Sequence, residues 1–168
     1  MIDLLTVVPA LHRGLIAAWL KRDHVSRWWG DPAVCLAQCD ATPSGQHALI
    51  AERGMPIGYL RWGRVEAKDL ATAGLVALPE GFVDIDILIG AAEACGQGAG
   101  PRALRLLFDH LEATTDAPLA GLCSALANRR AHAAFQKVGC RLLTQFDDPT
   151  HGPCLVHIRD LRLEHPLG

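Results

Sequence analysis

Residues 94–102 read Ala94-Cys95-Gly96-Gln97-Gly98-Ala99-Gly100-Pro101-Arg102, a glycine-rich loop between an apolar strand and an amphipathic helix. Glycine at every second position from Gly96 to Gly100 leaves the backbone N–H groups without side-chain cover. The helix expected to begin at Pro101 directs the positive end of its dipole at the same place. The stretch therefore predicts a binding site for a phosphate-bearing ligand, with a plain reversal of the chain as the alternative.

The spacing of these glycines excludes two common phosphate-binding motifs. The dinucleotide fingerprint G-x-G-x-x-G requires glycine at position 101, where this chain has Pro101. No segment matches the P-loop pattern G-x-x-x-x-G-K-[ST]. A nucleotide-binding module of another fold stays open, and ATP or NAD would then be the ligand.

Strand and helix patterns alternate along the whole chain. Leu104, Leu107, Phe108 and Leu111 recur at helical spacing after the glycine loop, which predicts a helix packed on a sheet. In the first helix we expect Leu11, Leu15, Ala18 and Trp19 to share the buried face. We predict strands at 4–8, 46–52, 56–65, 82–89, 119–124, 141–146 and 154–161, and helices at 9–20, 24–29, 101–113 and 128–138.

Residues 66–80 and 147–153 lack a period and are predicted to be loops. No repeat or low-complexity linker interrupts the chain. We therefore expect residues 1–168 to form a single α+β domain around a mixed, mostly antiparallel sheet flanked by helices.

Length and charge limit the classes of partner. A chain of 168 residues can bury roughly 70% of its unfolded surface, which is enough for a core and a cleft. With 16 basic and 18 acidic residues, it has no net attraction for nucleic acid or an anionic membrane. The N-terminus has no basic leader and no run is long enough to span a membrane. We expect a cytoplasmic protein, monomeric or homodimeric.

Six cysteines and eight histidines do not form a recognisable ligand pattern. No CxxC pair and no H-x-x-x-H pair with a nearby acid occurs, so we predict no metal site. A domain of this size needs no disulfides, and Cys123, Cys140 and Cys154 are expected to be small core residues. His24 is expected to be satisfied by local hydrogen bonds at a helix end.

Two carboxylates share one face of the strand at 82–89. Its alternation places Phe82, Asp84, Asp86 and Leu88 on one side and four β-branched aliphatic residues on the other. The two carboxylates then lie roughly 7 Å apart. If that face borders a cleft, repulsion and partial burial raise the pKa of at least one of them, which suits a general base. The alternative is a face that is simply solvated.

The strand, the glycine loop and the following helix resemble the acyl-CoA-binding core of the GNAT superfamily of N-acetyltransferases. In that superfamily a loop of the form [QR]-x-x-G-x-[GA] holds the coenzyme A pyrophosphate. The frame here keeps both glycines but has Cys95 at the Gln/Arg position. The resemblance implies acetyl-CoA as co-substrate, bound by Gly96, Gln97, Gly98, Ala99 and Gly100.

Other segments are similar to one branch, the aminoglycoside 6'-N-acetyltransferases and their siderophore-acylating relatives; these segments are 19–30, 54–59, 84–86 and 128–140. The resemblance implies that Asp86 is the catalytic base. Backbone N–H groups near Leu88 and Ile89 would orient the thioester. Asn128 would bond the pantetheine arm, with a helix N-cap as a compatible role. Phe135 stands where many members have a tyrosine that protonates the thiolate.

The acceptor implied by the resemblance is a primary amine of a small molecule, bound near Trp28, Trp29 and Asp84. One of the two tryptophans is expected in the core. Aminoglycosides, and with them antibiotic resistance, are the first candidate, but the loop at 66–80 is poor in acids and Cys123 replaces a further aspartate. A siderophore precursor, a protein N-terminus and a non-catalytic acyl-CoA-binding role stay open.

Overall fold

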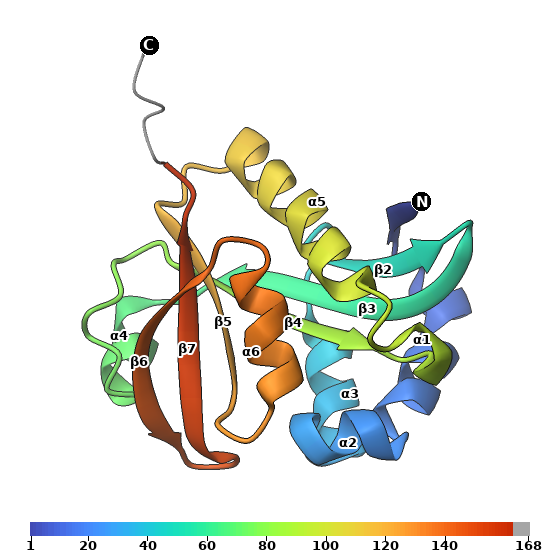
Figure 1. Cartoon of the computed structure of the whole chain (residues 1–168), viewed down its shortest axis with the longest axis horizontal. Coiled ribbons are helices and arrows are strands. Elements are labelled where there is room, and N and C mark those ends of the chain that lie inside the picture. Colours follow the sequence, from blue (N-terminus) through green and yellow to red (C-terminus); the bar gives the residue numbers. More distant parts are fainter. Residues whose placement is uncertain (163–168) are drawn as a thin grey trace.

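The computed structural model describes residues 1–162, and in this part of the chain seven strands form one sheet of order β1-β2-β3-β4-β5-β7-β6 (Figure 1). The strands are β1 (Ile2–Thr6), β2 (His47–Glu52), β3 (Met55–Arg64), β4 (Val83–Ile89), β5 (Leu119–Ala125), β6 (Arg141–Asp148) and β7 (Gly152–Asp160). All neighbouring pairs are antiparallel except β4 with β5, which are parallel. The predicted α+β class with a mixed, mostly antiparallel sheet is confirmed.

Helices cover both faces of this sheet: α1 (Pro9–Leu20), α2 (Asp23–Trp29), α3 (Pro32–Ala41), α4 (Ala67–Thr72), α5 (Ala99–Thr114), α6 (Arg129–Gln136) and the short 3-10 turn η1 (Ala92–Ala94). One core cluster joins α5 and α6 to Val83 and Ile85 of β4. A second joins α1, α2 and α3 to Tyr59 and Leu88. Because alternate residues of β4 enter opposite cores, its even-numbered residues face the α1–α3 side, as predicted.

Helix α5 begins at Ala99, two residues before the predicted start. Gly98 is its N-cap, with a φ of +77° that L side chains rarely adopt. Pro101 is the third helical residue, where its missing N–H costs no intrahelical bond. All four residues predicted to face the sheet are fully buried, namely Leu104, Leu107, Phe108 and Leu111.

The hairpin of β2 and β3 closes with two residues. Glu52 pairs with Met55, so Arg53 and Gly54 form the whole loop. Both have positive φ, 53° and 79°. This geometry matches the right-handed twist of the strands and joins the predicted strands at 46–52 and 56–65 in a tight hairpin.

The N-terminal predictions need two corrections. Strand β1 covers Ile2–Thr6 and not 4–8, because its partners in β2 run from Glu52 to Ala48. In α1, Leu11 and Ala18 were predicted on the buried face but are exposed, Leu11 to 73%, whereas Ile16 and Leu20 are buried. A short helix leaves two adjacent faces compatible with its apolar residues, and packing on α3 selects between them.

Two helices were missed. Helix α3 carries start signals that are visible in the sequence, since Asp31 accepts hydrogen bonds from the N–H groups of Ala33 and Val34 and Pro32 is the first helical residue. Helix α4 lies inside the predicted 66–80 loop and is held by the buried Leu70.

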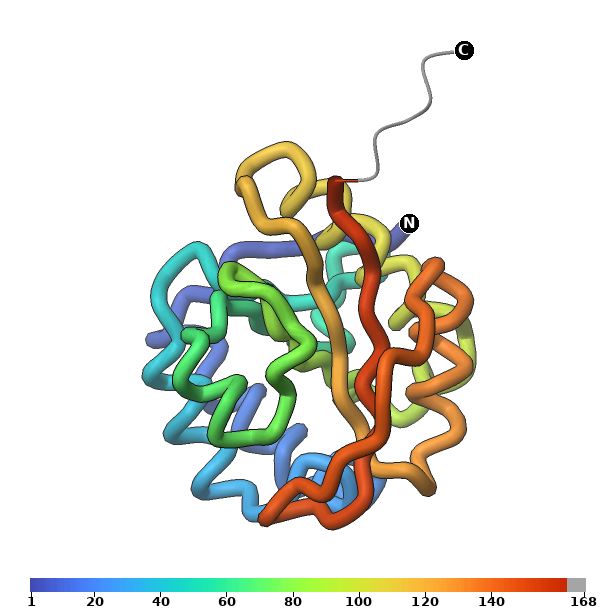
Figure 2. Tube along the Cα trace, turned by 90° about the vertical axis from the view of Figure 1, so that its left-hand side faces the viewer, coloured from blue at the N-terminus to red at the C-terminus, as the bar shows by residue number. Residues whose placement is uncertain are grey.

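The last hairpin is longer than predicted. Strands β6 and β7 pair as far as Asp148 with Gly152, which leaves only residues 149–151 as its turn. The turn formers at 147–153 therefore mark the end of the hairpin but not the length of its strands. Figure 2 shows this turn at the same end of the molecule as α2.

All six cysteines are free thiols. Cys140 and Cys154 are buried, as expected, but Cys123 is exposed, which contradicts its predicted core position. Within residues 1–162 no helix is long and apolar enough to cross a membrane.

A buried histidine pair makes stability depend on pH. The rings of His132 and His157 stack with centroids 5.2 Å apart, and the Nδ1 atom of each lacks a hydrogen-bond partner. Burial, together with the neighbouring His132, lowers the pKa of His157, so the folded state favours the neutral ring. Near pH 6.5, the ordinary pKa of His157, the unfolded chain therefore binds more protons than the folded chain.

We therefore expect the free energy of unfolding to fall as the pH drops from 7.5 through 6.5 to 5.5. Urea denaturation across this range measures it. His157→Leu should weaken the dependence, while the exposed control His110→Gln should keep it. An equal slope in wild type and His157→Leu would show that the pair plays no part.

Candidate active site

A cleft opens where two neighbouring strands diverge. Strands β4 and β5 pair only at Val83 with Ala120 and at Asp84 with Gly121, and beyond these positions they separate. The cleft has a volume of about 920 Å³, within the range of small-molecule sites. The divergence leaves the later residues of β4 without a partner on that side, so their backbone groups and side chains border the cleft.

The glycine loop forms one end of this cleft. Gly96, Gly98, Ala99 and Gly100 line it, whereas Gln97 is exposed and does not. The positive φ of Gly96 and Gly98 turns the chain on either side of Gln97, and its contact with coenzyme A stays a prediction.

The N–H groups of the first turn of α5 have no intrahelical acceptor. The first bond across the junction is donated by the N–H of Arg102 to the carbonyl of Gly98, at 3.3 Å. Its guanidinium donates to the carbonyls of Gly98 and Gln97 and pairs with Glu52. The loop is thus held in place, and the residues that carry the free N–H groups at the start of α5 line the cleft, an arrangement suited to a phosphate.

Cys95 does not reach toward a phosphate. Its thiol lies 3.9 Å from the carbonyl oxygen of Ile89 and 3.7 Å from that of Ala91, so it packs back on the loop. Basic side chains on the α6 side of the cleft, Arg129, Arg130 and Lys137, provide positive charge close to the loop.

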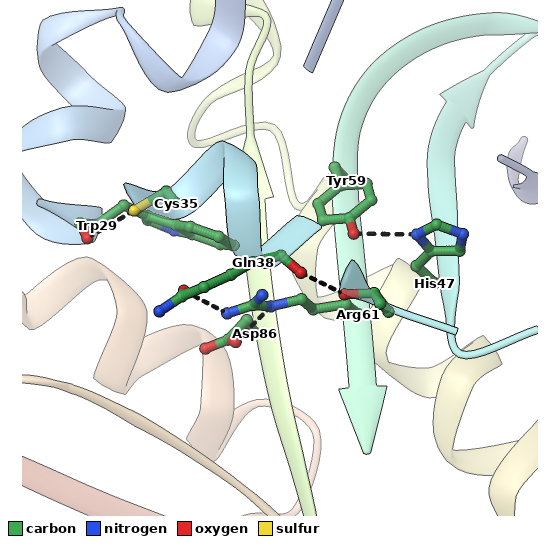
Figure 3. Close-up of polar contacts among 8 residues, drawn as sticks. Trp29, Cys35, Gln38, His47, Tyr59, Arg61 and Asp86 are labelled. Atoms are coloured by element: carbon green, nitrogen blue, oxygen red, sulfur yellow. Dashed lines mark hydrogen bonds and ion pairs between the residues drawn. The ribbon is translucent and has the colours of Figure 1, made fainter. Parts of the chain in front are cut away.

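The two carboxylates lie at the other side of the cleft, on the even-numbered face of β4, here called the acceptor side. The Nε of Arg61 donates to Asp86 at 2.8 Å, and a terminal nitrogen of the same guanidinium donates to Gln38 at 3.0 Å. Arg61 and Asp86 are direct register partners in β3 and β4. The guanidinium also lies over the ring of Trp29 (Figure 3).

Asp84 has a different environment. Within residues 1–162 it makes no ion pair with a basic side chain. Burial and the neighbouring charge of Asp86 raise its pKa to about 7, against a smaller opposing effect of Arg61. The sequence predicted that one carboxylate of the pair would have a raised pKa, and the structure assigns this property to Asp84.

Cys123 borders the cleft beside Asp84. It comes from β5, two strand positions after the last rung with β4. Although Cys123 is exposed as a residue, the surrounding cleft wall desolvates its thiolate and, with the neighbouring thiol of Cys154, raises the pKa of Cys123, so it stays a neutral thiol.

The backbone of β4 offers donors to the cleft at odd-numbered positions. The N–H of Gly90 bonds the carbonyl of Ile57, and the N–H of Val65 bonds that of Phe82. Alternation along this antiparallel pair assigns the N–H of Leu88 to β3 and directs those of Ile87 and Ile89 to the open side. Of the predicted pair Leu88 and Ile89, the geometry therefore favours Ile89, with Ile87 as the residue that sequence reasoning missed.

Helix α2 closes the cleft at the end of β4. Arg22 donates to the carbonyl of Gly90 at 2.8 Å, and a ring nitrogen of His24 lies 3.0 Å from the carbonyl oxygen of Ile89. The predicted local satisfaction of His24 was wrong, because its partner is 65 residues away. His151, in the β6–β7 turn, lies 3.2 Å from the carbonyl oxygen of Trp29 and ties this hairpin to α2.

Trp28 and Trp29 both line the cleft and both are half-buried. Neither is fully enclosed in the core, but Trp29 packs against the core of α1, α2 and α3. The thiol of Cys35 donates to its carbonyl at 3.1 Å. Trp29 thus supports the wall of the cleft, and the buried tryptophan of this region is Trp19.

Asn128 and Phe135 lie on the α6 side. Asn128 caps α6 by accepting from the N–H of Ala131, and its amide donates to Ser124 at 2.9 Å, which confirms the N-cap role. Phe135 is buried against the histidine pair and also borders the cleft. The one tyrosine of the chain, Tyr59, is fully buried against His47 on the far side of Arg61 (Figure 3). Tyr59 therefore does not take over the role that a tyrosine at position 135 would have.

The acids of the 66–80 segment contribute little. Asp69 lines the cleft, but Glu66 pairs with Lys68 on the surface and Glu80 lies elsewhere. Arg61 was not recognised in the sequence. No tight turn could reveal it, because Arg61 pairs with Asp86 across β3 and β4, which residues 65–82 connect.

Solved structures of similar fold include several acetyltransferases. Aminoglycoside acetyltransferase AAC(6')-Ib in complex with coenzyme A superposes with a TM-score of 0.78 at 21% identity, covering 95% of each chain. An aminoglycoside N(6')-acetyltransferase from Legionella pneumophila gives 0.72 at 16% identity, covering 95% of this chain and 92% of that one. RimL, a ribosomal L7/L12 alpha-N-protein acetyltransferase, gives 0.69 at 14%, covering 95% and 93%.

At these identities the likeness concerns the fold. No curated protein matches the chain in sequence. The model of the acetyltransferase (GNAT) domain family, in contrast, matches residues 9–148, most of the chain. The divergent β4 and β5, the glycine loop at the start of α5 and this match lead to one conclusion: the chain belongs to the GNAT acetyltransferases.

Proposed function

We propose that this protein transfers the acetyl group of acetyl-CoA to a primary amine of a small molecule. The observation that carries the proposal is the divergence of β4 and β5 after Asp84. It creates one cleft with unpaired N–H groups of a helix N-terminus at one end and two carboxylates at the other. A phosphate-bearing thioester and an ammonium can therefore meet between the strands.

The end of the cleft that the glycine loop forms is suited to bind a coenzyme A diphosphate, at Gly96, Gly98, Ala99 and Gly100. The first-turn N–H groups of α5 bind oxyanions without a side chain, so the loss of the family Gln/Arg at Cys95 leaves the main contacts intact. The pantetheine arm would run between the two strands toward Asn128. The N–H groups of Ile87 and Ile89 would then face the thioester oxygen.

The two carboxylates would remove the proton from the ammonium group of the acceptor. An alkylammonium with a pKa near 10 is only about 0.1% free base at neutral pH, and only the free amine attacks a thioester. Asp86, the predicted base, is ion-paired with Arg61, whereas Asp84 forms no ion pair within residues 1–162. We therefore assign proton acceptance to the pair, with Asp84 holding the proton and Asp86 supplying negative potential.

The transfer then follows in one sequence of bond changes. The amine nitrogen forms a bond to the acetyl carbon and gives its second proton to water, the carbon–sulfur bond breaks, and coenzyme A leaves as a thiolate. Phe135 has no proton to donate. A thiol pKa of about 8.5 lets the thiolate leave unassisted or take a proton from water.

Acetyl-CoA is expected to raise the melting temperature of the protein by several degrees, because a ligand that binds only the folded state stabilises it by mass action. ATP and NAD at equal concentration should give much smaller shifts. Release of the coenzyme A thiol on addition of amines then tests catalysis. Stabilisation by ATP or NAD alone, or acetyl-CoA binding without thiol release on any amine, would contradict the proposal.

Aminoglycosides are one acceptor class for this test, because the similar fold of AAC(6')-Ib is described with kanamycin and with ribostamycin. Acetylation of these compounds would connect the protein to antibiotic resistance. A siderophore precursor amine and a protein N-terminus are the other classes. The charged groups around Asp86 bear on which of these acceptor classes the cleft favours.

A further inference from the structure

Arg61 is a fixed cation in the wall of the acceptor side. Its guanidinium donates to Asp86 and to Gln38 at 2.8 and 3.0 Å and lies 5.8 Å from the ring centre of Trp29. Only 19% of its side chain is exposed. Contacts on three sides hold the charge where the amine of an acceptor must approach (Figure 3).

The carboxylates of the acceptor side are mostly engaged. Four line the cleft: Asp69, Asp84, Asp86 and Asp148. Asp86 is compensated by the guanidinium, and Asp148 accepts hydrogen bonds from its own turn and from His151. Asp69 lies exposed on α4. Within the described residues, Asp84 is thus the interior carboxylate left to match an incoming charge.

Apolar side chains line the same cleft as Asp84. The acceptor side is lined by Val65, Leu70 and Leu75 from the segment around α4 and by Phe82 and Phe146. An ammonium at Asp84 can bury an apolar body against them. A second ammonium on the same molecule would lose its hydration without a free carboxylate and would meet the charge of Arg61.

We propose that Arg61 restricts the acceptor to small amines with one positive charge on an apolar body, and disfavours diamines and aminoglycosides. The inference rests on the proposed function, because it concerns which amine that cleft accepts. It treats Arg61 as a specificity-determining residue that acts through charge and does not take part in the bond changes.

The test compares hexylamine with 1,6-diaminohexane, which differ by one ammonium at equal length. In thiol-release assays with acetyl-CoA, the kcat/KM of the wild type for hexylamine should exceed that for the diamine by about tenfold or more, since a like-charge contact with Arg61 costs binding free energy. Kanamycin should be poorer still. A wild type that prefers the diamine or kanamycin would overturn the inference.

Arg61→Gln removes the charge and retains groups that can bond Asp86 and Gln38. It should reduce the hexylamine-to-diamine ratio about tenfold, mainly through a better rate with the diamine. Damage to the fold alone would lower both rates together and leave the ratio unchanged, and so would speak against the inference. Arg13→Gln is the matched control, because Arg13 forms an exposed pair with Asp40 away from the cleft.

Calorimetric titration of the coenzyme A complex with the same two amines gives a readout that does not need turnover. Tighter binding of hexylamine than of the diamine supports the inference, and equal binding, reversed preference or no binding overturns it. If acetyl-CoA itself fails to bind, the proposed function fails instead. The two failures are therefore distinguishable.

Discussion

Asp84→Asn is expected to lower kcat by roughly 100-fold or more while the affinity for acetyl-CoA changes little. Asp84 borders the cleft, and burial raises its pKa to about 7. Its ionised form must accept the ammonium proton, so the wild-type kcat/KM should fall as the pH drops through about 7. The Asn variant has no such group, and its remaining activity should lack this acid limb.

Two further variants separate the roles of the pair. Asp86→Asn removes a negative neighbour of Asp84 and should move the acid limb to lower pH, because that charge is one cause of the raised pKa. Arg61→Gln removes a neighbouring cation that lowers this pKa and should move the limb to higher pH. Asp40→Asn, in an exposed ion pair, is the control.

The measurement is kcat/KM from pH 5.5 to 9 with acetyl-CoA and one amine. Wild-type turnover in Asp84→Asn would remove Asp84 from the mechanism. If Asp86→Asn alone abolished the acid limb, Asp86 would be the base, as the family resemblance implied.

Gly121→Ala is expected to destabilise the fold by about 3 kcal/mol. A Cβ at this position would lie 2.6 Å from the backbone oxygen of His157 and 2.9 Å from the ring of Phe82. Strand β5 lies between β4 and β7, so it cannot move away from β7 without pressing on β4 at Asp84. The close approach that glycine permits is therefore part of what holds the two strands together at the closed end of the cleft.

Urea denaturation measures this loss, with Gly14→Ala as the matched control. No atom lies within 4 Å of a Cβ at Gly14, which is inside α1, so alanine there should stabilise the protein by about 0.5–1 kcal/mol. Similar midpoints for the two variants would show that the packing around Gly121 yields more easily than the distances indicate.

The strand at Val83–Ile89 and the helix Ala99–Thr114 were predictable from the sequence. Both depend on local patterns, alternation with β-branched residues in the first and a four-residue apolar stripe in the second. Helix α4 was not predictable in this way. It is six residues long, and its order depends on burying Leu70 against residues distant in the chain.

The candidate site likewise has features that the sequence predicts and features that only the tertiary structure decides. The sequence alone determined that two carboxylates share a strand face and that a glycine loop precedes a helix, because both facts follow from backbone periodicity. Only the tertiary structure decided that Arg61 engages Asp86 and leaves Asp84 with the raised pKa. It also placed Cys123 at the cleft and not in the core. Charge compensation and desolvation depend on neighbours brought together from β3, β4 and β5, and no local pattern contains that information.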